Sequence, residues 1–248
     1  MTTHHQAEHL FKGAFAEEYQ FLNRICPLAA VMSQRVGDVV GHWPARSDGQ
    51  PLSVLELGCG TGITTHCLLQ SRPDIQVHAI DNAPAMLNQA RAALAEAVRG
   101  GRLRIEENDA LNALRSLPDA SIDLVVSAYT LHNLLYGYRH QVLAEVFRVL
   151  KPGGAFVNGD RYALDDPAAH LAITQGELSG YFRILLEDMQ RPDLLEQWVL
   201  HHFSDESEEH IMRLGKALDE MAAIGFQDVR FNHREGVNAL VTGVKPWR

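Results

Sequence analysis

The sequence predicts an α/β protein built on a parallel β-sheet with helices on both faces. Strand-like apolar runs alternate with helical patterns between residues 52 and 160, and this alternation is typical of parallel sheets. A glycine-rich turn, GCGTG, directly follows the first apolar run. A chain of 248 residues, 46% of them apolar, favours one main domain with an elaboration over two independent domains.

The strands and helices follow one another regularly up to residue 109. LSVLEL (52–57) is a nearly continuous apolar run, and GITTHCLLQS (62–71) has helical spacing. IQVHAID (75–81) is the second strand and AMLNQARAALAEAV (85–98) the second helix. LRIEEND (103–109) is the third strand, and a short linker is expected after it.

The second half of the chain continues the sheet and then changes character. IDLVVSAY (122–129) is the fourth strand, HQVLAEVFRVL (140–150) the next helix, and AFVNGD (155–160) the fifth strand after the turn KPGG. Near the C-terminus, FQDVRFNHR (226–234) and VNALVTGVK (237–245) flank Glu-Gly and are predicted to form a hairpin.

Four segments are expected from these patterns. Residues 1–50 form an N-terminal helical cap, 51–160 the core, 161–215 a helical lid, and 216–248 the last helix and the C-terminal hairpin. In the lid, helical periodicity breaks at Pro192 and restarts near Ser204, because Asp205 and Glu206 suit a helix N-terminus.

Composition excludes several classes of function. The net charge is -9 and there is no basic run, so no nucleic-acid partner is expected. The N-terminus has no targeting pattern and no window approaches 18 apolar residues, so we expect a soluble, cytoplasmic protein without a membrane partner. Cys26, Cys59 and Cys67 are too few and too irregularly spaced for a disulfide framework. The oligomeric state stays open, and a homodimer is compatible with the sequence.

The glycine turn predicts a nucleoside ligand without phosphates. Its order is Gly58-x-Gly60-x-Gly62, so the third glycine comes one position too early for a dinucleotide fingerprint. A carboxylate at Glu56 would repel a pyrophosphate but would suit a ligand that carries an ammonium and a sulfonium. S-adenosylmethionine is such a ligand. The alternative is a glycine turn that serves packing alone.

Two acids at strand ends add to this prediction. Asp81 ends the second strand, where it can accept hydrogen bonds from both ribose hydroxyls. Asp109 ends the third strand, where it can accept from the adenine amino group while the amide of Ala110 reaches a ring nitrogen. For each acid, the alternative is a simple turn or helix N-cap role.

Five motifs in order resemble the class I S-adenosylmethionine-dependent methyltransferases: LELGCGTG, AIDNAPAML, ENDALN, IDLVVSAYTLHNL and VFRVLKPGGAFV. The resemblance covers residues 52–160 and implies a Rossmann-like, seven-stranded, mostly parallel sheet with an antiparallel last strand and a helical lid after strand 5. The pattern is closest to the carboxy-S-adenosylmethionine synthase-like branch, through DNAPAM, the tyrosine of EEYQFL, the long insertion and the terminal NALVTGVK.

The loop, the strand ends and the resemblance together give a set of expected cofactor contacts for S-adenosylmethionine: Tyr19, Glu56, Gly58, Cys59, Gly60, Asp81, Asn82, Asp109, Ala110, Ser127 and Ala128. The chain departs from the branch in its lid. Members of the branch bring basic residues from this insertion to the cofactor, whereas Arg183 and Arg191 are the only Lys or Arg between residues 165 and 209.

Catalysis in this class needs little beyond alignment of the reacting groups. Near the fourth and fifth strand tips, His132 is a candidate base and Asn133 a candidate positioning residue, and Tyr19 and Tyr181 are the aromatic candidates. The alternatives are an exposed helical His132 and tyrosines that only pack between helices. Other candidates near the tips are Tyr129, Asp160, Arg161 and Tyr162. The remaining histidines show no ligand pattern, so no metal is predicted.

Three functions agree with these residues. The leading one is methyl transfer to a small metabolite, neutral or cationic because the lid is rich in acids. The second is chemistry on S-adenosylmethionine itself: cyclisation to a small cyclic amino acid with release of methylthioadenosine, or formation of the carboxylated cofactor. The third is a non-catalytic S-adenosylmethionine-binding module. The sequence does not identify the acceptor or decide whether a general base is needed.

Overall fold

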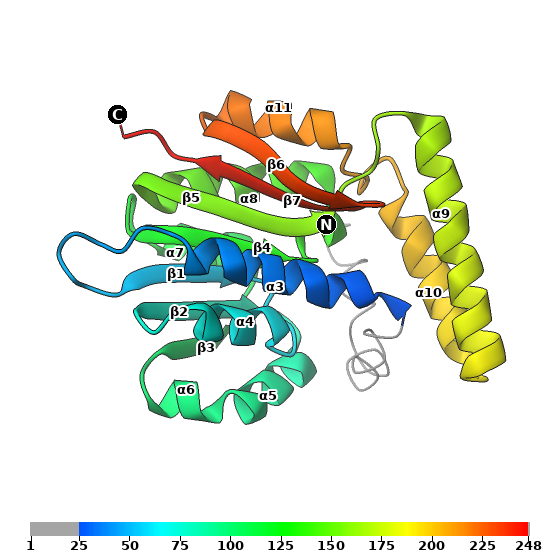
Figure 1. The fold of residues 1–248 in the computed structure, drawn as a ribbon, viewed down its shortest axis with the longest axis horizontal. Coiled ribbons are helices and arrows are strands. Elements are labelled where there is room, and N and C mark those ends of the chain that lie inside the picture. The colour runs from blue at the N-terminus through cyan, green and yellow to red at the C-terminus, as the bar shows by residue number, and fades with distance from the viewer. Residues whose placement is uncertain (1–24, 248) are drawn as a thin grey trace.

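A seven-stranded sheet forms the centre of the computed structural model, which describes residues 25–247 (Figure 1). The strand order is β3-β2-β1-β4-β5-β7-β6. Neighbouring strands are parallel except at β7, which runs antiparallel to both β5 and β6. The predicted Rossmann-like sheet with an antiparallel last strand is therefore confirmed. The strands are β1 (Leu52–Leu57), β2 (Ile75–Asp81), β3 (Leu103–Glu107), β4 (Ile122–Ala128), β5 (Leu150–Arg161), β6 (Gln227–Glu235) and β7 (Asn238–Val244).

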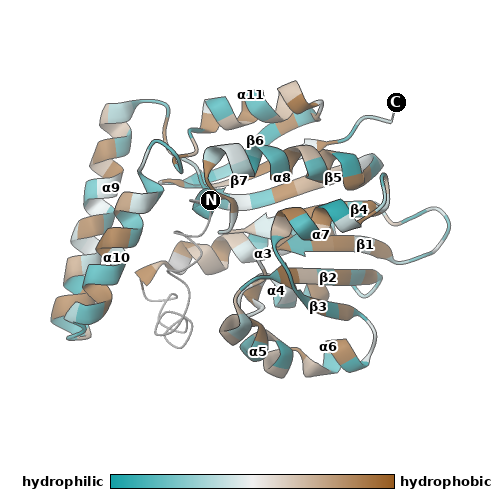
Figure 2. Cartoon of the chain, turned by 180° about the vertical axis from the view of Figure 1, so that it is seen from behind, coloured by the Kyte–Doolittle hydropathy of each residue, from teal (hydrophilic) through white to brown (hydrophobic). Residues whose placement is uncertain are grey.

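Helices cover both faces of the sheet, and each face has its own apolar core (Figure 2). One core joins the sheet to α3, α4 and α5, and the other joins it to α7, α8 and α11. These helices are α3 (Pro27–Gly41), α4 (Ile63–Ser71), α5 (Pro84–Ala93), α7 (Ala110–Ser116), α8 (Tyr136–Val149) and α11 (Leu214–Ile224). The shorter elements are α6 (Ala95–Arg99) and the 3-10 turn η4 (Leu131–Asn133).

The structure corrects two expectations about the core helices. Residues after the third strand form helix α7 rather than a linker, because the Asp109 carboxylate accepts hydrogen bonds from the backbone N–H groups of Leu111 and Asn112 at its start. The predicted single helix at 85–98 is divided into α5 and α6. Leu94 leaves the helical conformation between them and buries its side chain beside Gly62.

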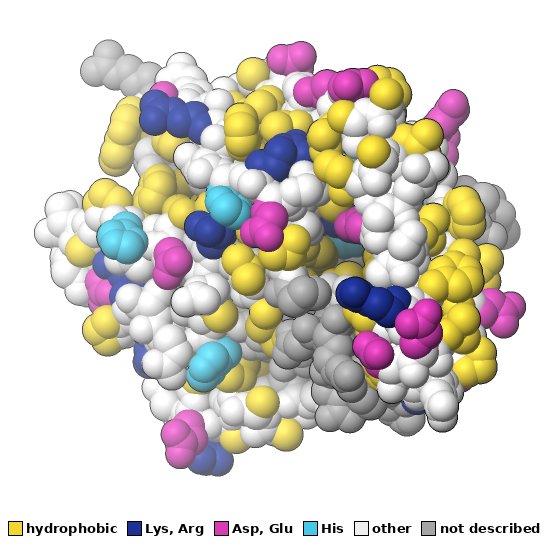
Figure 3. Space-filling model, turned by 45° about the vertical axis from the view of Figure 1, so that its right-hand side comes forward, with side chains coloured by type: hydrophobic (Ala, Val, Ile, Leu, Met, Phe, Trp, Pro, Cys, Tyr) yellow, Lys and Arg dark blue, Asp and Glu magenta, His cyan; other side chains and the backbone are white. Residues whose placement is uncertain are grey.

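The lid segment (161–215) stands at one end of the sheet, with helices α9 and α10 side by side (Figure 1). Figure 3 turns this end of the molecule forward, and both apolar and acidic side chains are exposed on it. The predicted break at Pro192 is confirmed, but the predicted restart near Ser204 is wrong, since α10 is continuous through that residue. Its first turn already holds Pro192 and the acidic Asp193, both of which favour a helix N-terminus. The lid elements are α9 (Pro167–Phe182), the π-helix η5 (Arg183–Asp188) and α10 (Pro192–Asp205).

The described part of the N-terminal cap is mainly helix α3, which packs against α4 and beside β5. Tyr19, an expected cofactor and catalytic residue, lies outside the described residues. Within residues 25–247, no helix is both long enough and apolar enough to cross a membrane.

Candidate functional site

The glycine loop between β1 and α4 is the first component of the site. Gly58 has φ 70°, a conformation that favours glycine, and a Cβ there would lie 2.1 Å from Oγ1 of Thr130. Gly60 also has a positive φ of 53°, and its N–H donates to Oδ2 of Asp81 over 2.8 Å. The loop therefore presents bare backbone to the cleft beside it, as close approach of a ligand requires.

Asp81 joins the glycine loop to the next strand end. Its Oδ1 accepts from the N–H of Ala83 over 2.9 Å, and its Oδ2 accepts from the Gly60 N–H. Burial raises the pKa of this carboxyl, while the backbone N–H groups of Ala83 and Gly60 oppose that rise. Since each carboxylate oxygen has two lone pairs, Asp81 keeps acceptor capacity for ribose hydroxyls.

Asp109 and Ala110 lie at the end of β3, on the same cleft. In the structure, Asp109 has the alternative role of a helix N-cap, because its Oδ1 accepts hydrogen bonds at the start of α7. Its Oδ2 accepts a hydrogen bond from the hydroxyl of Tyr138, and the same hydroxyl accepts from the N–H of Leu111 over 3.2 Å. An adenine amino group at Asp109 would share this carboxylate with Tyr138, and the adenine contact stays a prediction.

A cleft of about 790 Å³, its open mouth included, runs along the carboxyl ends of β1, β2, β3 and β4. Its position agrees with the rule that open α/β sheets bind ligands at this edge. The structure brings eight of the predicted site residues together in its lining: Gly58, Gly60, Asp81, Asn82, Asp109, Ala110, Ala128 and Asn133. None of the lining residues is Lys or Arg, so the cleft offers no side-chain cation for a pyrophosphate.

Three predicted cofactor residues lie beneath the cleft instead of lining it: Glu56, Cys59 and Ser127 are all buried. The Glu56 side chain does not reach the cleft beside the glycine loop. Its Oε2 accepts from Oγ1 of Thr65 over 2.6 Å, and burial raises its pKa to about 8. At neutral pH this carboxyl is therefore mostly uncharged, and its direct contact with the cofactor stays a prediction.

His132 is buried, with 5% of its surface exposed, so the exposed alternative is wrong. Its Nδ1 lies 2.5 Å from Oδ1 of Asp160, which is fully buried. Burial lowers the pKa of His132, but the carboxylates of Asp160 and Asp205 raise it above its usual value. The pair sits behind the cleft wall, where Asp160 Oδ2 also accepts from the N–H of Leu131.

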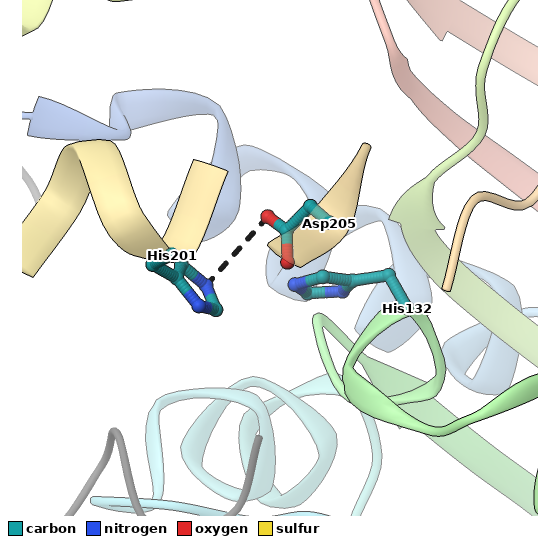
Figure 4. A group of neighbouring side chains, drawn as sticks. All are labelled: His132, His201 and Asp205. Atoms are coloured by element: carbon teal, nitrogen blue, oxygen red, sulfur yellow. Dashed lines mark ion pairs between the residues drawn. The ribbon is translucent and has the colours of Figure 1, made fainter. Parts of the chain in front are cut away.

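His201 and Asp205 of α10 approach His132 from the lid (Figure 4). His201 Nε2 and Asp205 Oδ2 are 3.6 Å apart, and one ligand atom from each of the three residues lies within 4.8 Å of the others. Sequence spacing alone did not reveal this grouping, because His132 is distant in the chain.

Arg161, at the end of β5, attaches the lid to the sheet. Its guanidinium donates two hydrogen bonds to Glu177 of α9, at 3.0 and 2.9 Å, and one to Glu206 at 3.3 Å. It also lies 3.6 Å from Asp205. The acidic side chains of the lid therefore compensate the buried charge of Arg161. Glu177 and Glu206 also accept hydrogen bonds from its guanidinium.

Tyr181 belongs to the interior of the lid and does not line the cleft. It packs in an apolar cluster with Leu185 and Trp198, and its ring lies 5.9 Å from that of His202. The packing alternative for Tyr181 therefore describes its position, and a catalytic role stays a prediction.

Tyr129 was predicted from the sequence only as one of the other candidates near the strand tips. In the structure it lies in the cleft wall, in a strained backbone conformation. Its φ is 53°, which is uncommon for a bulky residue, and its hydroxyl donates to Oδ1 of Asn238 on β7. The next residue, Thr130, packs against Gly58. Seven lining residues were not predicted as site residues: Ile80, Ala83, Met86, Asn108, Thr130, Leu134 and Tyr138. All but Tyr138 lie within the quoted motifs, which could therefore have indicated them.

The fold and cleft define a class of protein that binds a nucleoside without phosphates. Asp81 suits the hydroxyls of a ribose, and the apolar side chains of Ile80, Met86 and Leu134 suit a base. The glycine backbone at positions 58 and 60 leaves room for the part of the ligand that extends beyond the ribose. S-adenosylmethionine fits this set of residues.

Comparisons with known proteins agree with this class. The family model described as a methyltransferase domain matches residues 54–154. A carboxy-S-adenosyl-L-methionine synthase from Klebsiella pneumoniae is 31% identical over 93% of this chain and 96% of its own. A demethylmenaquinone methyltransferase from Deinococcus radiodurans is 32% identical over 58% of this chain and 56% of its own. An O-methyltransferase family protein from Burkholderia thailandensis has a TM-score of 0.65 at 19% identity, covering 97% of this chain and 63% of its own.

The chain belongs to the class I S-adenosylmethionine-dependent methyltransferase family. It is an enzyme of this family, with S-adenosylmethionine as its ligand.

Proposed function

We propose that S-adenosylmethionine is the substrate of this enzyme and that no separate acceptor takes part. The observation that carries this proposal is how much of this chain aligns with each of two relatives, a named synthase and a named methyltransferase. The relative named carboxy-S-adenosyl-L-methionine synthase, whose product is made from the cofactor, aligns over 93% of this chain, so the match includes lid residues. The relative named for methyl transfer aligns over 58%. The lid segment thus has a counterpart in the relatives named carboxy-S-adenosyl-L-methionine synthase.

The charges around the lid favour cyclisation over carboxylation. A carboxylated product brings an additional carboxylate, which needs a cation near the sulfonium. Two guanidinium groups are buried at this end of the described sheet, and both are already hydrogen-bonded. Arg139 donates to the backbone carbonyls of Leu134 and His210, and Arg161 donates to Glu177 and Glu206. Arg183 is exposed, and Arg191 is paired with Asp193. An intramolecular reaction adds no charge that these residues must compensate.

The cyclisation forms one bond and breaks one. The amine nitrogen of the methionine part bonds to the γ-carbon, and the bond between that carbon and sulfur breaks. Sulfur keeps the electron pair, methylthioadenosine leaves, and the ammonium releases one proton to solvent or to a base. The other product is an amino acid with a four-membered ring that contains the nitrogen.

Asn133 is the residue that we assign to orient the amine. Its side chain lines the cleft, and its Nδ2 donates to the backbone carbonyl of Tyr129 over 3.3 Å. Its Oδ1 is buried and has no hydrogen-bond partner among the described residues. An amine N–H is a suitable donor for this oxygen, and a buried acceptor without a partner is costly. Accepting from the amine would direct the nitrogen lone pair away from Asn133.

The test is incubation of the purified protein with S-adenosylmethionine alone, followed by mass spectrometry. We expect methylthioadenosine and the cyclic amino acid in equal amounts, far above the spontaneous rate. Asn133→Ala should slow this formation by about tenfold or more, since one oriented hydrogen bond is lost. Asn232→Ala is the matched control, because Asn232 is an exposed residue of β6.

Three other results would contradict the proposal. A carboxylated cofactor after addition of prephenate would assign the reaction of the named synthases. S-adenosylhomocysteine formed only with a metabolite extract would assign methyl transfer, with a neutral or cationic acceptor expected from the acid-rich lid. Tight binding of S-adenosylmethionine without turnover in any of these mixtures would assign a binding module.

A further inference from the structure

We propose that His132, His201 and Asp205 bind a divalent transition-metal ion that fastens the lid to the sheet. This site is separate from the cleft and does not depend on the proposed function. His132 comes from the turn η4 after β4, while His201 and Asp205 come from α10 of the lid (Figure 4). All three are buried, with 5%, 6% and 8% of their surfaces exposed. The proposal replaces the expectation of no metal, which rested on sequence spacing.

The donor atoms already converge. His201 and Asp205 are one helical turn apart and therefore share one face of α10, the face turned toward His132. Their nearest donors are 3.6 Å apart, and no two of the three ligand atoms are farther apart than 4.8 Å. In a tetrahedral zinc site with ligands at 2.0–2.1 Å, neighbouring donors are about 3.3 Å apart. Closing the group therefore needs side-chain movements of about 1 Å.

His132 also has the outer contact that a metal-binding histidine needs. Its Nδ1 is hydrogen-bonded to the carboxylate of Asp160, so a proton held at Nδ1 leaves the lone pair of Nε2 for the ion. A carboxylate behind a histidine is the usual arrangement in such sites, where it fixes the tautomer and the ring orientation.

The charge around the group favours a cation. The carboxyl groups of Glu177, Asp205 and Glu206 surround the guanidinium of Arg161, and the carboxyl group of Asp160 is paired with His132. Asp160 and Asp205 are buried, and Glu177 and Glu206 are half-buried. Carboxylates in such surroundings that exceed their cations are costly, and a divalent ion offsets part of this excess. Arg161 lies 3.6 Å from Asp205, and the buried guanidinium of Arg139 bonds to the carbonyl oxygens of Leu131 and His210 nearby. Both cations lessen the attraction, but the four carboxylates outnumber them.

The donor set indicates the kind of ion. Two imidazoles and one carboxylate suit zinc and similar first-row ions better than calcium or magnesium, which prefer oxygen ligands. A small cavity adjoins the group and is lined by His132, Asp205 and Met212 among others. It gives room for water as the fourth ligand. Because the ligands come from both the sheet and the lid, the ion would link them directly.

The experiment is a calorimetric titration of the full-length, chelator-treated protein with Zn²⁺, in the absence of S-adenosylmethionine. Stoichiometric binding is expected, together with an increase in the melting temperature. Co²⁺ in place of Zn²⁺ should give the absorption bands of a four-coordinate ion with nitrogen and oxygen ligands. These readouts do not involve turnover, so they remain informative if the proposed reaction is wrong.

Three variants test the assignment of ligands. His201→Gln and Asp205→Asn should each weaken Zn²⁺ binding by about 100-fold and remove the rise in melting temperature. His170→Gln is the matched control, because His170 is a buried lid histidine that bonds to Glu206 outside the group. Circular dichroism identifies any variant that fails to fold. Absence of stoichiometric binding by the wild type, or equal affinity in both ligand variants and the control, would overturn the proposal.

Discussion

Glu56→Gln should remove a pH-dependent loss of stability that the wild type shows between mildly acidic and neutral pH. Glu56 is 1% exposed, and burial raises its pKa from 4.5 in the unfolded chain to about 8 in the folded protein. A raised acid pKa stabilises the fold fully below the unfolded pKa, and this contribution is lost as the pH rises toward the folded pKa. The isosteric amide keeps the acceptor for Thr65 but does not titrate.

The magnitude follows from the width of this interval. Between the two pKa values the unfolded state releases a proton that the folded state retains, so stability falls by about 1.4 kcal/mol per pH unit. From about pH 5 to about pH 7, the wild type should lose roughly 2–3 kcal/mol relative to Glu56→Gln. Other titrating groups are common to both proteins and cancel in this difference.

Urea denaturation of both proteins at several pH values measures the difference directly. The control is Thr65→Val, which removes the hydroxyl that donates to Glu56 and should raise its folded pKa further. A difference between wild type and Glu56→Gln that stays constant with pH would refute the protonated state of Glu56 and support a charged carboxylate beneath the loop.

Three further predictions concern the cleft and the lid. Asp81→Ala should weaken S-adenosylmethionine binding by roughly 1–3 kcal/mol in calorimetry, because the ribose would lose an acceptor; unchanged affinity would remove Asp81 from the ribose site, and measurable NAD binding would contradict the interpretation of the loop. Gly58→Ala should abolish binding and lower the melting temperature, since its Cβ would overlap Thr130; a stable, binding variant would refute this geometry. Hydrogen exchange in residues 161–215 should slow when S-adenosylhomocysteine is added, whereas equal protection with and without ligand would make the lid static.

The sheet was predictable because each strand carries a local signal and the order of the motifs implies the topology. The helix at Ala110–Ser116 was not predicted, since its start depends on a cap by Asp109, and this cap was considered only as the alternative to adenine binding. Glycines at positions 58 and 60 were recognised because few residues tolerate their backbone angles.

The rest of the site depends on tertiary contacts that no local pattern records. Glu56 is adjacent to the loop in sequence, yet the alternation of side chains along β1 turns it into the core beneath, where Thr65 bonds to it. Tyr138 reaches Asp109 across 29 positions of the chain, and His132 meets His201 through the approach of the lid. Distances of this kind become visible only once the elements are packed.

The place of β7 has a consequence for how the protein is made. This strand follows the lid and β6 in sequence but lies inside the sheet, between β5 and β6, where Asn238 pairs with Arg161 and Ala239 with Asp160. During synthesis, the site-bearing end of β5 therefore stays without this partner strand until the lid, α11 and β6 have all been made. Removal of residues 238–244 would leave an open sheet edge at β5, next to the lid, and would also detach β6, which pairs with β7.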